Sequence, residues 1–581
     1  MLDVTINGRA MSAEEGTTIL EAARKAGAHI PTLCHLDMHS IRMVNKVGTC
    51  RVCMVEIEGR RNLAPACSTL ITDGMAVRTN TSRVIKARRA VVELFLSNHP
   101  KDCLVCARNQ NCELQSLAAE MGIRDVRYNG KQSGHAKDAS SRSLVRDPNK
   151  CVLCRRCETM CNEVQTVGVY SCVNRGFDTV MGTAFNLPMQ STSCTFCGQC
   201  VSVCPTGALT EVDNTKDVWE AIDDPEKFVI VQTAPAVRAA LGESFGMDAG
   251  ARVTGKMVSA LRMMGFDRVY DTDFAADLTI VEEAAELLDR IRNGGRLPIL
   301  TSCCPAWVRF IEHQFPDLLD VPSTCKSPHE MFGALAKTYL AEKLGVEPGN
   351  IVVVSIMPCL AKKYEAARPE LENNGLPNVD LALSTRELAY MIREAGLIFP
   401  ELPDGDFDRV MGQSSGAGVI FGATGGVIEA ALRTAAHYFG EILENVEFKQ
   451  LRGMDGIREA AVAIGGMELK IGIANGLGNS RRLLERIQTG TAQYHAIEIM
   501  ACPGGCVGGG GQPYHGNDLR VISKRAEALY AEDADKKIRM SHENPEVIRL
   551  YEDFLGRPGG EKSRQLLHTA YVRRDQYSYV N

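Results

Sequence analysis

The stretch EIMACPGGCVGGGGQP, from Glu498 to Pro513, contains two cysteines, Cys502 and Cys506, beside the glycine run Gly508–Gly511. Packed helices and strands disfavour such a run, so it predicts that a bulky group lies close to the backbone here. Thiolates are natural soft ligands for iron and similar metals. Taken alone, the cysteine pair fits a redox dithiol or a zinc knuckle equally well.

Two further stretches place cysteine beside proline directly after an apolar run. TSCCPAW (301–307) follows Leu297–Leu300, and MPCLAKKYE (357–365) follows Ile351–Ile356. The first stretch likewise follows Ala496–Ile499. Because loops at the carboxyl ends of strands in an open α/β sheet converge on one crevice, the three loops are predicted to share a single site.

The thiols of these loops outnumber the ligands of one cubane. Cys304, Cys359, Cys502 and Cys506 suffice for a 4Fe-4S cluster, which leaves Cys303 over. The surplus thiol is therefore a candidate for chemistry rather than ligation.

The composition of the chain limits the classes of protein to which it can belong. The chain has 581 residues, 22 cysteines, 45% hydrophobic residues and a net charge of -6, which together predict about four globular domains and disfavour nucleic acid or anionic membrane as partners. The first residues carry acidic groups and no apolar core of a signal peptide, and no apolar run is long enough to cross a membrane. We expect a cytoplasmic protein whose CxxC groups bind metal.

Residues 1–80 are predicted to form a small ferredoxin-like domain. Val4–Ile6 and the Asn7–Gly8 pair predict a hairpin, and Thr18–Glu21 is a capping box that begins a helix ending near Ala26. The thiols that follow suit a 2Fe-2S cluster, with a four-cysteine zinc site as the alternative. They are Cys34, Cys50, Cys53 and Cys67.

Residues 81–128 offer one imidazole and three thiols, in the order HPKDCLVCARNQNC. His99, Cys103, Cys106 and Cys112 fit zinc as well as iron on chemistry alone, so both alternatives stay open here. Residues 129–147 are polar and predict a solvated connection.

Residues 148–212 repeat the spacing C-x2-C-x2-C-x3-C, which is typical of two-cluster ferredoxins. Since the fourth cysteine of each run ligates the other cluster in that arrangement, we predict two crossed ligand sets rather than zinc or disulfides. One set is Cys151, Cys154, Cys157 and Cys204, and the other is Cys194, Cys197, Cys200 and Cys161. Cys172 and Cys325 fit no cluster and are expected to be small buried apolar residues.

From residue 213 the pattern alternates between strands and helices. Val229–Val231 and Leu469–Ala474 predict strands, and Val253–Met264, Leu278–Ile291 and Pro328–Leu344 predict helices. The segment QTAPAVRAALG (232–242) also leaves a strand end and should line the same crevice. The expected fold is therefore a multidomain α+β and α/β protein with a large α/β body at 213–515 and a tail at 516–581.

The three cysteine motifs resemble, in order and spacing, the signatures of the iron-only (FeFe) hydrogenases, and most closely the large subunits of cytoplasmic NAD(P)-linked or electron-bifurcating enzymes. The resemblance implies an H-cluster, in which Cys304, Cys359, Cys502 and Cys506 hold a cubane. Cys506 also bridges to a diiron group bearing CO, CN and a dithiolate amine. It further implies a 2Fe-2S site at 1–80, as in respiratory complex I, a one-histidine, three-cysteine 4Fe-4S site at 81–128, and a small-subunit-like tail.

The resemblance also implies the surroundings of the diiron group. Lys362 and backbone N–H groups such as that of Ala236 would donate to cyanide. The residues expected to pack around the group are Met357, Met500, Phe421 and Gly422, although a methionine beside a strand is ordinarily core. Two positions depart from the family: His329 stands where glutamine is expected, and Ala236 where serine is common.

A proton route is implied as well, with Cys303 as the terminal donor and acceptor. Glu283 and Glu286 lie three residues apart on one helical face and resemble the family's path together with Ser323 and Arg290. Without the resemblance, Glu286 and Arg290 would be interpreted as a surface i,i+4 ion pair.

The implied activity is the reversible conversion of protons and electrons into H2. No G-x-G-x-x-G follows a strand and no Walker motif is present, so electrons should leave through partners in a hetero-oligomer. The expected partners are a flavin- and NAD(P)-binding subunit, a small 2Fe-2S subunit and ferredoxin. The competing hypotheses are a non-catalytic hydrogen sensor or iron-sulfur carrier, and a complex I-like relay, which leaves the motifs after residue 300 unexplained.

Overall fold

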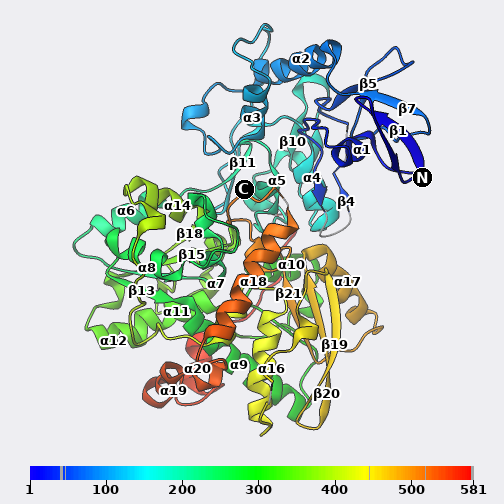
Figure 1. Cartoon of the computed structure of the whole chain (residues 1–581). Helices are drawn as coiled ribbons and strands as arrows, with labels where there is room; N and C mark the ends of the chain where they lie inside the picture. Colours follow the sequence, from blue (N-terminus) through cyan, green and yellow to red (C-terminus); the bar gives the residue numbers. More distant parts are fainter. Residues whose placement is uncertain (39–42, 46–47, 444, 517, 578–581) are drawn as a thin grey trace.

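The computed structural model describes residues 1–38, 43–45, 48–443, 445–516 and 518–577. The N-terminal modules, blue to cyan in Figure 1, lie together above a larger body with two lobes. One lobe is green and contains β15 (Ile351–Met357) and β18 (Leu381–Ser384), and the other is yellow to orange and contains β19 (Ile457–Ile464), β20 (Met467–Asn475) and β21 (Ala496–Met500). No helix among the described residues has the length and apolar character needed to cross a membrane.

The first module is a five-stranded sheet packed on a short helix. The strand order is β2-β1-β7-β5-β6, formed by Arg9–Ala13, Leu2–Ile6, Met75–Arg78, Met54–Ile57 and Ala64–Pro65. The predicted hairpin is confirmed, since β1 pairs with β2 and both Asn7 and Gly8 have positive φ angles, 50° and 85°. The predicted capping box is also confirmed, with Thr18 and Glu21 capping α1 (Ile19–Lys25).

The next modules are mostly helix and loop. Helix α2 (Ser82–Asn98) leads to His99, and α3 (Glu113–Glu120) begins directly after Cys112. Further along the chain, β8 (Leu144–Arg146) pairs with β11 (Leu209–Glu211), and the short helices α4 (Arg156–Thr159) and α5 (Gln199–Val203) lie between them in the chain. A small hairpin of β9 (Ser171–Val173) and β10 (Val180–Gly182) separates the two cysteine runs.

The green lobe is built on a parallel sheet in the order β13-β12-β15-β18. These strands are Arg268–Asp271, Phe228–Thr233, Ile351–Met357 and Leu381–Ser384. Both faces are covered because side chains alternate along β12: Val229 packs with α8 (Thr254–Met263) and α14 (Thr385–Glu394), and Ile230 packs with α9 (Thr272–Arg292) and α11 (Pro328–Leu335).

The second lobe has its own sheet, in the order β14-β21-β20-β19. These strands are Ile299–Leu300, Ala496–Met500, Met467–Asn475 and Ile457–Ile464. Helix α16 (Gly426–Tyr438) covers one face, and α10 (Pro305–Gln314) and α17 (Leu477–Gln488) cover the other.

The expectation of one continuous sheet is wrong. The strand before Cys359 belongs to the first sheet, whereas the strands before Cys304 and Cys502 belong to the second. The three loops nevertheless meet, because the carboxyl ends of both sheets point into the junction between the lobes. The strand predicted at Leu297–Leu300 is also shorter, covering only Ile299 and Leu300.

The C-terminal tail packs across this body. Helix α18 (Leu519–Asp535) lies against α15 (Gly416–Ile420) and α7 (Pro235–Arg238), and Figure 1 shows it running across the front of the body. Helices α19 (Pro545–Leu550) and α20 (Glu561–Leu567) pack on α9 and α11. The described residues of the tail therefore cover parts of both lobes.

Candidate catalytic and iron-sulfur sites

A buried apolar cavity lies where the two lobes meet. Cys303 and Cys506 reach it from the second lobe, and Cys359 and Lys362 from the first. The other lining residues are Ala234, Pro235, Thr272, Ala276, Pro328, His329, Met357, Pro358, Phe421 and Gly422. The predicted contribution of segment 232–242 is confirmed through Ala234 and Pro235.

The four predicted cubane ligands lie near one another, and two of them, Cys359 and Cys506, line this cavity. Burial raises the pKa of Cys359 and of Cys502, and the neighbouring thiols Cys304 and Cys506 add to both shifts. Such mutual influence requires the four sulfurs to lie close together. A group of buried thiols with apolar surroundings fits a metal cluster, which binds thiolates and releases their protons.

The glycine run is explained by close approach, although the neighbouring atoms belong to the chain itself. A Cβ at Gly509 would lie 2.2 Å from the Pro358 carbonyl oxygen, and one at Gly510 would lie 2.6 Å from the Cys197 carbonyl oxygen. These glycines therefore let the Cys506 loop pack on both the Cys359 loop and the second ferredoxin run.

Lys362 is part of a buried network on the cavity wall. Its Nζ donates to Glu365 Oε2 at 2.6 Å and to the Cys303 carbonyl oxygen at 3.2 Å, and His329 Nε2 lies 2.7 Å from the same Glu365 oxygen. Although burial opposes the shift, Lys362 and His329 lower the pKa of Glu365 to about 2. The departure at His329 thus introduces a partner for Glu365, a residue that sequence reasoning missed. Its spacing of three residues from Lys362 on one helix was the available signal.

The other predicted pocket residues divide into two groups. Met357, Phe421 and Gly422 line the cavity. Ala236 and Met500 are fully buried but are not among the lining residues: a Cβ at Gly422 would lie 3.3 Å from Ala236, and Met500 packs in the cluster that contains Cys303 and Phe421. Their contact with a bound group stays a prediction.

The predicted proton-route residues follow one another from the cavity outward. Burial raises the pKa of Cys303 well above its usual value, and the charge of Glu283 adds to this. Burial and the charge of Glu286 raise the pKa of Glu283 to about 8, and its Oε1 atom has no hydrogen-bond partner among the residues that the structure describes. Ser323 then donates to Glu286 Oε2 at 2.9 Å.

Glu286 and Arg290 do form the i,i+4 ion pair, at 2.6 Å. The pair is partly buried, with side-chain exposures of 15% and 12%, so it is not a solvated surface pair. Arg290 also donates to the carbonyl oxygens of Val321 and Pro322. The ion pair is therefore present but only partly exposed, and it holds Glu286 beside Ser323. The role of Glu286 and Arg290 in proton transfer stays a prediction.

The first crossed ligand set surrounds a small apolar cavity. Cys151, Cys154, Cys157 and Cys204 all line it, as predicted from the repeat. Burial raises the pKa of Cys157 well above its usual value, with further contributions from Cys154, Cys151 and Cys204.

The second crossed set is also brought together. Burial raises the pKa of Cys200 well above its usual value, and Cys197, Cys194 and Cys161 add to the shift. Burial raises the pKa of Cys197 too, with a contribution from Cys304, so this set lies next to the thiol of Cys304.

The four thiols of the first module are in mutual contact. Cys53 Sγ lies 3.3 Å from Cys67 Sγ, and hydrogen bonds that Cys34 accepts from Cys50 and Cys67 lower the pKa of Cys34. Asn45 Nδ2 donates to the carbonyl oxygens of Cys34 (2.7 Å) and Cys154 (3.1 Å), which places this set beside the first cubane set.

The histidine-containing set is more open. Burial lowers the pKa of His99, which favours the neutral imidazole that a metal requires. Burial raises the pKa of Cys112, with a contribution from Cys106, while Cys103 is exposed. A Cβ at Gly207 would lie 2.7 Å from Cys106 Sγ, so this set also lies close to the Cys204 loop.

Cys172 and Cys325, which fit no cluster, differ in their exposure. Cys325 is buried as expected, at 1% exposure, but Cys172 is exposed, so the prediction for Cys172 is wrong. Cys172 lies on β9, whose three residues are exposed or half-buried.

Family comparisons cover nearly the whole chain. The family described as iron only hydrogenase large subunit, C-terminal domain, matches residues 227–510, and iron hydrogenase small subunit matches 519–574. Before these, a 2Fe-2S iron-sulfur cluster binding domain matches 1–82, the NADH-ubiquinone oxidoreductase-G iron-sulfur binding region matches 88–127, and a 4Fe-4S binding domain matches 190–210.

Individual relatives agree. The NADP-reducing hydrogenase subunit HndD of Solidesulfovibrio fructosivorans is 58% identical, with 99% of this chain and 100% of that protein covered. Iron hydrogenase 1 of Clostridium pasteurianum is 41% identical over 99% of this chain and 100% of its own length. A solved structure of a single-residue variant of the [FeFe]-hydrogenase HydA1 from Chlamydomonas reinhardtii is 42% identical and superposes with a TM-score of 0.57, covering 63% of this chain and 100% of that one. The chain therefore belongs to the large catalytic subunits of the iron-only (FeFe) hydrogenases.

Proposed function

We propose that the cavity between the lobes is the site where this hydrogenase performs the reaction 2H⁺ + 2e⁻ ⇌ H2. The observation that carries the proposal is the convergence of Cys303, Cys359, Cys506 and Lys362 from two separate lobes on one buried apolar cavity. A non-catalytic iron-sulfur carrier needs the ligands but has no need of Cys303 followed by a line of buried acids.

The residues present fit an H-cluster. Cys304, Cys359, Cys502 and Cys506 would hold its cubane, and Lys362 together with backbone N–H groups would face its anionic ligands. When bound, the cluster supplies the iron centre that binds and cleaves H2. Lys362 is oriented by Glu365, so its ammonium group is fixed on the cavity wall rather than free to move.

Proton transfer is assigned to Cys303, Glu283, Ser323 and Glu286, in that order. Glu283, with a pKa raised by burial to about 8, is protonated at neutral pH but lies close enough to that range to release its proton. Ser323 can accept and donate through one hydroxyl, and it already contacts Glu286. The route therefore runs from a thiol at the cavity to a carboxylate near the surface.

Electron transfer is assigned to four further clusters. The set Cys194, Cys197, Cys200 and Cys161 adjoins the catalytic thiols, and the set Cys151, Cys154, Cys157 and Cys204 lies beyond it. The 2Fe-2S set adjoins the latter through Asn45, and the set with His99 adjoins it at Gly207. This arrangement makes the cubane of Cys151 the branch point of the electron route.

Partner subunits are assigned to the outer end of this route. Since a relative that matches the full chain is named an NADP-reducing hydrogenase subunit, we assign the chain to a hetero-oligomer with a flavin- and NAD(P)-binding subunit, a small 2Fe-2S subunit and ferredoxin. Leu104 and Val105 lie between Cys103 and Cys106 and are 90% and 85% exposed, which suits contact with such a partner.

Replacing Leu104 with aspartate tests the function and this contact together. In enzyme reconstituted with its partner subunits, H2-dependent NADP⁺ reduction should fall at least about tenfold, as at an interface hot spot, because a charge would be placed in an apolar contact. Reduction of a small viologen dye measures the hydrogenase chemistry separately. Ile442→Asp, at a residue that is 93% exposed on the second lobe, is the matched control. An equal loss of NADP⁺ reduction in both variants, or no loss in Leu104→Asp, would refute the contact. An unmodified enzyme that does not reduce viologen would refute the function.

A further inference from the structure

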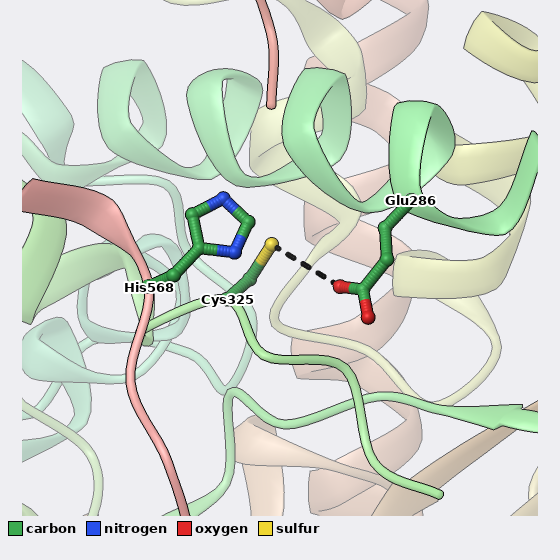
Figure 2. Close-up of side chains that lie close together, drawn as sticks. All are labelled: Glu286, Cys325 and His568. Atoms are coloured by element: carbon green, nitrogen blue, oxygen red, sulfur yellow. Dashed lines mark hydrogen bonds between the residues drawn. The ribbon is translucent and has the colours of Figure 1, made fainter. Parts of the chain in front are cut away.

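Three side chains with metal-binding donors meet beside the outer end of the proton route. Glu286 comes from α9, Cys325 from the loop before α11 and His568 from the tail directly after α20, and Figure 2 shows them pointing toward one another. One ligand atom of each lies within 4.8 Å of the others, and Cys325 Sγ lies 4.0 Å from Glu286 Oε2.

The backbone holds two of these residues in place. Cys325 and His568 form an antiparallel bridge, and the flanking bonds Lys326 N–H to Leu567 O (2.8 Å) and Thr569 N–H to Thr324 O (2.7 Å) extend it. Backbone hydrogen bonds therefore fix the tail against the loop. This pairing places the imidazole of His568 beside the thiol of Cys325.

The donor set is that of a zinc-class cation. Zinc binds thiolate, imidazole and carboxylate at about 2.0–2.3 Å, which in a tetrahedral site requires donor atoms about 3.4–3.7 Å apart. In the structure Cys325 Sγ lies 4.0 Å from Glu286 Oε2, and the three donor atoms lie at most 4.8 Å apart. Side-chain shifts of about an ångström would therefore bring them to the separations that zinc requires. Water from the adjoining cavity can supply the fourth ligand.

A buried carboxylate prepares the imidazole for ligation. Glu282 Oε2 lies 3.1 Å from His568 Nε2, and hydrogen bonds from His568, Ser563 and Tyr551 lower the pKa of Glu282 although burial opposes this. Because the ionised carboxylate only accepts, Nε2 carries the hydrogen. In the neutral ring Nδ1 is then left with its lone pair, which accepts from Thr324 Oγ1 at 2.7 Å. Metal-bound histidines typically have such a carboxylate partner.

The surroundings favour soft cations over hard ones. A cavity lined by Glu286, Thr324 and His568 leads to the site. Its charged lining is balanced, because the acids Glu282, Glu286 and Asp289 stand against Arg290, Arg557 and Arg564, so a cation held by charge alone, such as Mg²⁺, gains little there. A cation that also bonds to a thiolate has a further source of affinity. Arg290 can stay in place, because it binds Oε1 of Glu286 while Oε2 faces Cys325.

We propose that Glu286, Cys325 and His568 form a binding site for a zinc-class divalent cation, and that occupation of this site closes the proton route. The closing of the proton route rests on the proposed function. Binding releases the thiol proton of Cys325 to solvent and leaves no group oxidised or reduced. A cation on Glu286 Oε2 takes the lone pairs that now accept from Ser323, so Glu286 can no longer exchange protons with that hydroxyl.

The test uses the fully iron-loaded enzyme, Zn²⁺ as the probe and Mg²⁺ as the comparison. Zinc retained per chain is counted after equilibrium dialysis, and H2 turnover is normalised to each variant's own zinc-free rate. Saturating zinc should slow turnover at least about tenfold, since a positioned proton-transfer group contributes about 10²–10⁴-fold. A chelator should restore the rate without loss of iron, and Mg²⁺ should have no effect.

Cys325→Ala and His568→Gln are the informative variants, and Cys172→Ala is the matched control. Each of the first two should retain one zinc fewer and need at least about tenfold more zinc for half-inhibition, whereas the control should behave like the unmodified enzyme. Unchanged retention in both variants would overturn the site. Loss of one zinc in the variants without any inhibition of the unmodified enzyme would overturn the blockade. Failure of the proposed function is separate, because it would appear as absent turnover before zinc is added.

Discussion

Replacing Cys303 with serine should lower H2 turnover by about 10²–10⁴-fold while the iron content stays unchanged. The thiol lines the cavity, and its charge environment is set by Glu283 behind it, so it is the group that can pass protons between the cavity and the route. A serine hydroxyl keeps the size but is a far weaker acid. The measurement is H2 evolution from a reduced dye, with iron determined on the same sample.

The adjacent thiol provides the control. Cys304→Ser should lose cluster iron as well as activity, because Cys304 lies among the proposed ligands. Full turnover in Cys303→Ser would contradict the proton assignment, and loss of iron in that variant would make Cys303 a ligand instead.

Replacing Glu283 with glutamine should lower turnover by about 10²-fold or more, since the amide keeps the shape but cannot relay a proton. The same change should alter the pH dependence of unfolding. Burial raises the folded-state pKa of Glu283 from 4.5 to about 8, so the stability associated with this group is fully present below pH 4.5 and is lost as the pH rises through about 8.

Glu283→Gln should therefore be more resistant to unfolding than the unmodified enzyme near pH 8, and the advantage should disappear below about pH 5. Thermal unfolding across this pH range measures it, with Glu286→Gln as the comparison, because Glu286 is ion-paired rather than isolated. A pH-independent difference would show that Glu283 is not the buried titrating acid.

Local signals predicted the hairpin and capped helix of the N-terminal module and the grouping of the first ferredoxin-type cysteines. The Asn7–Gly8 turn and the Thr18–Glu21 box depend on neighbours in sequence, and both are found as predicted. The ferredoxin repeat likewise predicted that Cys204 joins Cys151, Cys154 and Cys157, and these four line one cavity. Fixed spacing carries such information because the ligands of a cluster must meet.

Contacts between residues far apart in the sequence could not be predicted in the same way. Nothing in the apolar runs before Cys359 and Cys502 distinguishes one sheet from two, since a strand does not specify its neighbours. Helix α9 begins at Thr272, earlier than the predicted Leu278, because Asp273 and Asp277 look like surface residues but are buried. Asp277 accepts hydrogen bonds from Ser415, Ser541 and Asn544, two of which belong to the distant tail.

The infrared spectrum of anaerobically matured protein tests the central claim most directly. If thiols from both lobes hold an H-cluster in the cavity lined by Cys303, Cys359 and Cys506, the spectrum should contain bands of metal-bound CO and CN. The sample should also hold about 20 iron atoms per chain. A chain loaded with iron that shows no such bands would contradict the account.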